Sequence, residues 1–355
     1  MKATAQPLTT KLPVGPERRA PALSLFGGVH PSSGAATIEK ATLPTNIPAS
    51  DATYLAAPED GRTPLCAPAQ RTSLSVYADL FKARLTLLVL LTTMVGFYIG
   101  FRGPVNYLLM FSTLLGTALV AGGASALNQL LEREYDAKML RTQDRPLPSG
   151  RLQPFTVLIV GCLSAVIGLV YLAFTVNLTT CALGAFSLLS YLFIYTPLKR
   201  ITWLNTAVGA VPGALPPLMG WTAARGELTA EGWALFALLA FWQLPHFLAI
   251  AWMYRDEYAR AGFKMLPGVD PTGHRTGRQA VWHTLGLLPV SLCPFLFRLA
   301  GPIYLSGALL LGLAFLWFAI QFSRHLTVPR ARQLFLCSIL YLPLLLGLMV
   351  LDKVK

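Results

Sequence analysis

The sequence predicts an all-α, polytopic membrane protein of about nine transmembrane helices. Of its 355 residues, 54% are hydrophobic and only 13% are charged, whereas about a quarter of the residues are charged in a typical soluble domain. The charges are confined to short stretches, separated by long windows without Asp, Glu, Lys or Arg. A helix that crosses the bilayer needs roughly 20 mainly apolar residues, so each window is a candidate span.

Eight such windows follow one another along the chain. They are 85–101, 103–131, 152–198, 201–224, 232–254, 279–297, 299–323 and 333–351. The window 152–198 is too long for one helix, and polar residues around Asn177 favour a turn near its middle. We therefore expect a hairpin of two helices there, which makes nine spans. In the next window, a run of small residues and prolines from Gly209 to Gly220 would allow close helix packing or a broken helix beside a cavity.

Residues 1–73 differ in kind from the rest of the chain. They are rich in Pro, Ala, Thr and Gly and hold no long apolar run, so we expect a flexible cytoplasmic tail, followed by a transmembrane domain over residues 74–355. The tail lacks the compact apolar core of a signal peptide. Its few acidic residues and the pair Arg18 and Arg19 leave a mitochondrial transit peptide open as an alternative.

The basic residues are distributed unequally between the two membrane faces. The N-terminal segment and the loops after the even-numbered spans carry 24 of the 29 Lys and Arg residues. Because cytoplasmic loops are enriched in Lys and Arg, we expect the N-terminus and these loops on the cytoplasmic side of a bacterial inner membrane, with the mitochondrial inner membrane as the alternative. This bias and attraction to anionic membrane lipid account for the net charge of +13, so nucleic acid is not expected as a partner. The five cysteines show no metal or disulfide pattern.

An acidic row closes the second predicted span. Asn128, Glu132 and Asp136 stand four residues apart, so on a helix they share one face. Carboxylate and amide oxygens are ligands that suit Mg²⁺ bound to a substrate diphosphate. The alternative is a solvated helix end, whose carboxylates pair with neighbouring basic residues.

A basic row follows the acidic row. Lys138, Arg141 and Arg145 recur at intervals of three or four residues before Pro146. Arginine can hold phosphate oxygens in a bidentate fork. A basic row beside a carboxylate row therefore favours a site for a metal diphosphate.

A second acidic site follows the sixth predicted span, on the same side of the membrane. It contains Asp256 and Glu257, with Lys264 close behind. If the sixth helix continues to this point, Glu257 lies 11 residues after His246 and shares its face, whereas Asp256 is rotated away. His246 lies inside a span, where an ionisable residue is a functional candidate. A neutral imidazole bound to a neighbouring helix is the alternative.

The fourth predicted span ends with a third group of polar residues. Tyr195, Lys199 and Arg200 lie on the face of the membrane that holds both acidic sites. The basic pair could reach a diphosphate. Alternatively, Tyr195 and Lys199 anchor the helix end at the lipid headgroups.

At these residues the chain resembles the UbiA superfamily of intramembrane prenyltransferases. Asn128, Glu132 and Asp136 match its signature Asn-x-x-x-Asp-x-x-x-Asp with one Glu for Asp, and Tyr195 and Lys199 match its Tyr-x-x-x-Lys element. The resemblance covers residues 76–351. Within the superfamily it is sharpest to the haem O synthase branch, in the segments 138–150, 198–206 and 242–247.

One departure from the superfamily concerns the second signature, Asp-x-x-x-Asp. Asp256 is followed at the fourth position by Arg260. The branch's own pattern, an acid before Tyr in an acid-Tyr-x-x-Ala-Gly run, fits Glu257 to Gly262. Either Asp256 or Glu257 is thus open as a metal ligand, and the helical phase favours Glu257.

The resemblance implies a bundle of helices around a central cavity, in which a farnesyl group passes from farnesyl diphosphate to haem b with addition of water. The expected Mg²⁺ ligands are Asn128, Glu132, Asp136 and Glu257, and the expected catalytic residues are Glu132, Asp136, Glu257 and Lys199. The expected substrate-binding residues are Asn128, Lys138, Arg141, Arg145, Tyr195, Arg200, His246, Asp256 and Lys264. The resemblance also suggests a haem A synthase or an oxidase assembly factor as a partner.

Two other functions fit parts of the pattern. A prenyltransferase that acts on the aromatic ring of a quinone precursor would share the metal motifs and differ only in the branch-specific loops. A transporter would also use basic loops and a proline-broken helix, but it is expected to place ionisable groups near the membrane midplane. Here the acidic residues gather at one face.

Overall fold

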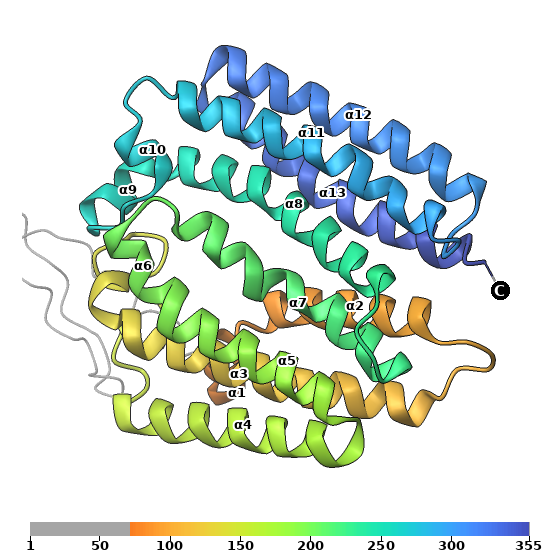
Figure 1. Cartoon of the computed structure of the whole chain (residues 1–355). Coiled ribbons are helices and arrows are strands. Elements are labelled where there is room, and N and C mark those ends of the chain that lie inside the picture. The colour runs from red at the N-terminus through yellow and green to blue at the C-terminus, as the bar shows by residue number, and fades with distance from the viewer. Residues whose placement is uncertain (1–71, 355) are drawn as a thin grey trace, which may run out of the picture. The chain divides into compact units, whose positions relative to one another are not determined.

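The computed structural model describes residues 72–354, and every regular element in that range is a helix (Figure 1). The elements are α1 (Ser73–Leu80), α2 (Ala83–Gly100), α3 (Tyr107–Asp136), α4 (Pro154–Thr175), α5 (Leu178–Leu189), the π-helical turn η1 (Ser190–Tyr195), α6 (Thr196–Ile201), α7 (Asn205–Arg225), α8 (Ala230–Met253), α9 (Arg255–Arg260), α10 (Leu266–Val269), α11 (His274–Leu296), α12 (Pro302–His325) and α13 (Val328–Leu351). The prediction of a flexible tail over residues 1–73 lies outside the described residues, except for Thr72 and Ser73, which cap and begin α1.

The expected all-helical membrane fold is confirmed. Eight helical stretches in the described part of the chain are long and apolar enough to cross a membrane. Beside them stands α7, which has 21 residues and is less apolar because of its Gly, Pro and Thr residues. Their outer faces carry exposed side chains such as Phe174 and Leu310, which are 86% and 71% exposed. Lipid tails are the surroundings that suit such faces.

The predicted hairpin in the window 152–198 is also confirmed. α4 ends at Thr175, and the next span, formed by α5, η1 and α6, begins at Leu178. The side chain of Asn177 accepts a hydrogen bond from the backbone N–H of Thr180 at 2.8 Å. This N-cap satisfies a donor at the start of α5 and so favours the turn at this position.

α3 carries the acidic row to the end of the bundle. The Asn106 side chain caps its first turn by accepting from the N–H of Leu109 at 3.0 Å. A helix of 30 residues is about 45 Å long, which exceeds the roughly 30 Å of the hydrocarbon core. Its last turns, with Glu132 and Asp136, therefore lie toward one membrane face. α3 packs mainly against α4 (Figure 1).

The run from Gly209 to Gly220 forms part of α7, and α7 is continuous despite three internal prolines. Pro216 has no N–H to bond the carbonyl of Pro212, and the Ser187 hydroxyl donates to that carbonyl at 3.3 Å instead. The predicted close packing is present: a Cβ at Gly96 of α2 would overlap the backbone carbonyl of Pro217. The backbones of α2 and α7 can approach because glycine has no Cβ.

Candidate active site

The bundle encloses a cavity of about 380 Å³ with one charged end. The polar side chains that line the charged end include Lys82, Asn128, Glu132, Asp136, Arg145 and Lys199. The rest of the wall is mostly apolar and comes chiefly from α2, α3, α5, α7 and α8. A cavity of this kind suits a ligand with an anionic head and a long apolar body.

The acidic row of α3 forms one side of the charged end. Asn128, Glu132 and Asp136 all line the cavity, and they are only 1%, 4% and 2% exposed. Ionised carboxylates at such positions require partners, because burying an unpaired charge costs several kcal/mol or more. The basic side chains that pair with these carboxylates therefore determine what the site can bind.

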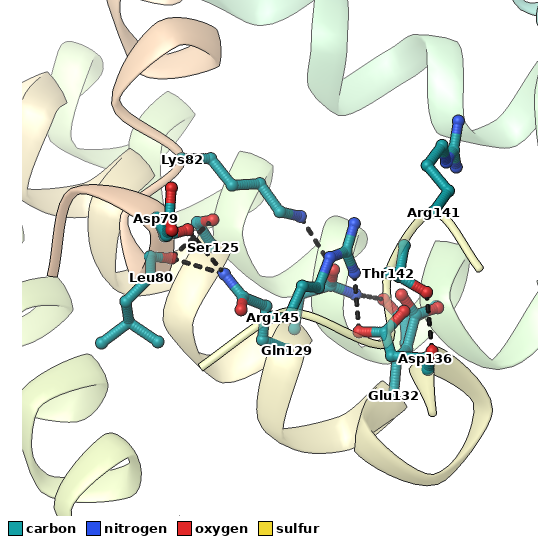
Figure 2. Close-up of polar contacts among 12 residues, drawn as sticks. Asp79, Leu80, Lys82, Ser125, Gln129, Glu132, Asp136, Arg141, Thr142 and Arg145 are labelled. Atoms are coloured by element: carbon teal, nitrogen blue, oxygen red, sulfur yellow. Dashed lines mark hydrogen bonds and ion pairs between the residues drawn. The ribbon is translucent and has the colours of Figure 1, made fainter. Parts of the chain in front are cut away.

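Each carboxylate of the row is paired with one basic side chain. The Lys199 ammonium lies 2.8 and 3.1 Å from the two carboxylate oxygens of Glu132. Arg145 donates from Nη1 to Oδ2 of Asp136 at 2.6 Å (Figure 2). Of the basic row expected beside the acidic row, Arg145 thus pairs with it directly, and the second partner, Lys199, comes from the polar group at the end of the fourth span.

The loop after α3 folds back on the helix and brings Arg145 to Asp136. The Thr142 hydroxyl donates to the backbone carbonyl of Asp136 at 2.8 Å (Figure 2). Met139 and Leu147 are buried on either side and anchor the loop. Arg141 also lines the cavity, and its guanidinium binds the Tyr258 hydroxyl at 2.9 Å.

The π-helical turn η1 directs two tyrosines at the same end. Tyr191, which sequence reasoning did not single out, donates from its hydroxyl to Oδ1 of Asn128 at 3.1 Å. Tyr195 stacks on Tyr191, and the Lys199 ammonium lies 4.5 Å from the Tyr195 ring centroid. π-Helical turns are frequent at functional sites. Here the π-helical turn follows α5 directly, and both tyrosine rings lie on the cavity wall.

Lys82 is a second functional candidate that sequence reasoning missed. It lies between α1 and α2 with φ of 47°, a left-handed conformation that is costly for a residue with a Cβ. Its ammonium reaches Oδ1 of Asn128 at 3.4 Å. Burial, followed by repulsion from Arg145 and Lys199, lowers the pKa of Lys82 to about 7. A lysine directly before an apolar span is usually a headgroup anchor, so the sequence offered no clear signal.

The expected geometry of the second acidic site is wrong in one respect. α8 ends at Met253, and the short α9 begins at Arg255 after a break at Tyr254. The helical phase that favoured Glu257 over Asp256 therefore does not hold. A turn with different backbone angles interrupts the periodicity on which that argument depends.

Five predicted site residues lie outside the cavity wall; they are Lys138, Arg200, Asp256, Glu257 and Lys264. Glu257 remains close to the mouth, since its Oε2 accepts from the backbone N–H of Arg141 at 3.5 Å. Asp256 is exposed beside Arg255. Within residues 72–354, no three His, Cys, Asp or Glu side chains form a metal-binding group. Glu257 as a metal ligand beside Glu132 and Asp136 thus stays a prediction.

The other three residues of this set contact the rim of the site. Arg200 donates to the Tyr135 hydroxyl at 2.9 Å, and Lys138 lies over the Tyr135 ring. The backbone of Lys264 accepts from Asn205 and donates to the carbonyl of Lys199. Lys264 therefore supports the turn that carries Lys199.

His246 lines the cavity, as do the two residues that precede it by three and four positions. Its ring stacks between Trp242 and Phe335, with centroids 5.2 and 5.0 Å away. Its Nδ1 lies 2.7 Å from the Ser338 hydroxyl. His246 therefore fits both roles expected for it. Its ring is bound to a neighbouring helix, as a structural imidazole would be, and it also lines the cavity, as a substrate-binding residue would.

Residues 72–354 form a bundle of membrane-length helices with a basic and carboxylate site at one end of an apolar cavity, an arrangement typical of intramembrane proteins with amphipathic ligands. The chain belongs to the UbiA prenyltransferase family, whose sequence profile matches residues 89–342. It is therefore a transferase. This family is the one that the motifs in α3 and around Tyr195 resemble.

Curated relatives agree with this assignment, and solved structures share the fold. The chain is 49% identical over 286 residues to a protoheme IX farnesyltransferase of Solibacter usitatus, covering 78% of this chain and 98% of the relative. It is 44% identical to the protein of that name from Koribacter versatilis, covering 78% and 93%. Its fold is similar to a digeranylgeranylglyceryl phosphate synthase (TM-score 0.68, 15% identity, 79% and 98% covered). It is also similar to a UbiA homolog from Archaeoglobus fulgidus bound to GPP and Mg²⁺ (TM-score 0.55, 16% identity, 77% and 99% covered).

Proposed function

We propose that this chain transfers the farnesyl group of farnesyl diphosphate to a vinyl group of haem b and adds water, which makes haem O. The observation that carries the proposal is a cationic cluster, formed by Lys82, Arg145 and Lys199, on the wall of an otherwise mostly apolar cavity. The cluster suits a diphosphate, and the apolar wall suits an isoprenoid and a porphyrin. The names of the relatives at 44–49% identity support the choice of haem as the acceptor.

The donor set fits Mg²⁺ that is bound together with a diphosphate. Asn128, Glu132 and Asp136 offer one amide and two carboxylate oxygens within one buried row. Mg²⁺ is typically held by one or two carboxylates plus substrate phosphates rather than by a cage of protein ligands alone. Glu132 and Asp136 are the residues that would hold it. Bound there, Mg²⁺ would offset the negative charge that develops on the departing diphosphate.

The basic residues of the chain bind and stabilise the leaving group. Arg145 and Lys199 pair with the two carboxylates, and Lys82 reaches Asn128 beside them from a third segment. An incoming diphosphate favours the protonated form of Lys82, so the three basic side chains together suit a diphosphate. When the C1–O bond of the donor breaks, the electron pair leaves with the diphosphate, and these side chains stabilise that charge electrostatically.

The apolar wall protects the remaining allylic cation from early reaction with water. The vinyl carbon of haem b then forms a bond with farnesyl C1, and the positive charge moves to the carbon next to the porphyrin ring. A water molecule adds there and releases a proton. The products are a hydroxyethylfarnesyl haem and diphosphate.

We also propose that the charged end of the cavity faces the cytoplasm of a bacterial cell. The support is the excess of Lys and Arg on the loops at that end. In intact spheroplasts, a cysteine introduced at exposed Glu134 should react with a membrane-impermeant maleimide only after the membrane is opened. Labelling in sealed spheroplasts would contradict this orientation.

A single matched pair of variants tests the proposed function. Purified protein with haem b, farnesyl diphosphate and Mg²⁺ should yield a haem whose mass includes farnesyl and water. Glu132→Gln should lose this turnover, because the substitution removes one of two cavity carboxylates. Glu134→Gln should retain it, since Glu134 is 77% exposed and, among residues 72–354, its ion-pair partner is the exposed Arg133. Full turnover of Glu132→Gln would contradict the site, and conversion of a hydroxybenzoate-type acceptor in place of haem would favour the quinone-type function.

A further inference from the structure

Ser338 of α13 makes an unusual set of contacts for a buried serine. Its side chain is fully buried, and its hydroxyl lies 2.6 Å from the backbone carbonyl of Phe335 and 2.7 Å from Nδ1 of His246. Its own backbone carbonyl accepts from the indole N–H of Trp242 at 2.8 Å. Two residues of α8, Trp242 and His246, therefore form hydrogen bonds with the same residue of α13.

These distances determine which atom carries each proton. A hydroxyl has one proton, and a carbonyl oxygen has none to donate. At 2.6 Å from the Phe335 carbonyl, the Ser338 proton must lie on the line between the two oxygens, because two oxygen lone pairs would otherwise repel. The contact with His246 then requires a proton on Nδ1, with the Ser338 oxygen as acceptor.

The consequence for His246 concerns its other ring nitrogen. A neutral imidazole with its proton on Nδ1 has a lone pair on Nε2, and an unpaired imidazolium inside the bundle would be costly. Nε2 makes no hydrogen bond to any described residue, and His246 lines the cavity. Stacking between Trp242 and Phe335 fixes the plane of the ring, and the contact with Ser338 fixes which ring edge faces α13.

We propose that Ser338 is a positioning residue, which holds His246 as the Nδ1–H tautomer and thereby offers the Nε2 lone pair to the iron of a metalloporphyrin in the cavity. The choice of ligand rests on the proposed function. Imidazole nitrogen suits iron, and ligating histidines commonly donate their other N–H to a fixed acceptor. Loss of such an acceptor typically costs about 10- to 100-fold in affinity or activity.

The tautomer can be measured without any haem. The full chain has five histidines, so ¹⁵N-histidine labelling in bilayers and a difference spectrum against His246→Ala isolate the His246 signals. We expect a protonated Nδ1 and an unprotonated Nε2. Ser338→Ala should shift the population toward Nε2–H, and Ser338→Thr, which keeps the hydroxyl, should restore the original tautomer.

Ser291 provides the matched control. It is also fully buried, its hydroxyl donates to the carbonyl of Leu288 at 2.7 Å, and its carbonyl accepts from Tyr304 at 2.7 Å. Ser291→Ala removes an equivalent hydroxyl that does not touch His246, so its His246 spectrum should match that of the unchanged protein. A spectral change of equal size in Ser291→Ala and Ser338→Ala would indicate a merely structural role and overturn the proposal.

Haem b binding tests the second half of the proposal. Titration of haem b should shift its Soret band in the unchanged protein, and the affinity should fall about tenfold or more in Ser338→Ala. The shift should be absent in His246→Ala and return with free imidazole. The proposal would be overturned by an Nε2–H tautomer in the unchanged protein. It would also be overturned if the unchanged protein and Ser338→Ala had equal haem affinity and equal spectra. Failure of haem farnesylation by the unchanged protein would instead reject the proposed function, and the haem-free spectra would still decide the role of Ser338.

Discussion

The Lys199 ammonium binds both carboxylate oxygens of Glu132, at 2.8 and 3.1 Å, and joins the fourth span to the second at the charged end of the cavity. The side chains are 12% and 5% exposed. This pair is thus a structural link as well as part of the proposed diphosphate site. Its two roles can be separated by experiment.

Lys199→Gln should destabilise the protein more than loss of an exposed lysine does. Removing one member of a buried pair leaves an uncompensated charge, which costs about 3–5 kcal/mol. The double variant Lys199→Gln/Glu132→Gln should regain most of that stability. Thermal unfolding in detergent measures both, with Lys138→Gln as the exposed control. Equal stability of the single and double variants would show that the pair is not coupled.

Arg145→Lys should weaken binding of the prenyl diphosphate while it preserves the local charge. Lysine lacks the planar fork that lets arginine hold Asp136 and a phosphate at once. Loss of one charge-assisted hydrogen bond, about 1.5–3 kcal/mol, should raise KM for the donor about tenfold or more. Arg133→Lys, at an exposed position with one distant partner, should leave KM unchanged. Steady-state kinetics with varied donor would refute the assignment if the two variants behave alike.

Lys82→Gln should reduce donor binding although Lys82 belongs to no recognised motif. The Lys82 ammonium reaches Asn128 inside the cavity, whereas Arg84 two positions later is exposed. Donor KM should therefore rise about tenfold in Lys82→Gln and remain unchanged in Arg84→Gln. Lys82→Gly should lose donor affinity equally and yet unfold no earlier, because glycine relieves the left-handed backbone. Unaltered KM in both Lys82 variants would remove this residue from the site.

Gly96→Ala should destabilise the bundle because the added methyl group overlaps the Pro217 backbone. Overpacking of this kind costs about 1–3 kcal/mol. Gly347→Ala is the matched control, since it also lies in a helix but has no atom within 4 Å of the added Cβ. It should be neutral or stabilising by up to about 1 kcal/mol. Thermal unfolding in detergent that gives the same midpoint for both variants would contradict the α2–α7 packing.

The spacing of residues along the sequence was sufficient to predict several parts of the structure. The charge-free windows predicted the spans, because the bilayer sets their length. The four-residue spacing of Asn128, Glu132 and Asp136 predicted their shared face, because one long helix carries all three. Arg145 and Lys199 were predicted through their proximity to a helix end and through the family motif.

Tertiary structure decided the parts that were missed. Lys82 enters the cavity because of a left-handed bend between two helices, and Tyr191 reaches Asn128 from a π-helical turn; neither conformation has a sequence signature. The contact of Ser338 with His246 joins residues 92 positions apart. The position of Glu257 was misjudged because α8 ends at Met253, and a break of a single residue cancels any argument from helical phase.

Isotope labelling is the most direct test of whether farnesyl transfer to haem b occurs at the charged cavity. Purified protein is supplied with haem b, Mg²⁺ and ¹³C-labelled farnesyl diphosphate in H₂¹⁸O, and the haem is weighed by mass spectrometry. We expect a product that carries both the labelled farnesyl group and one ¹⁸O, formed by the unchanged protein and not by Glu132→Gln. Haem that remains unmodified, or that gains farnesyl equally in Glu132→Gln, would contradict farnesyl transfer at this site.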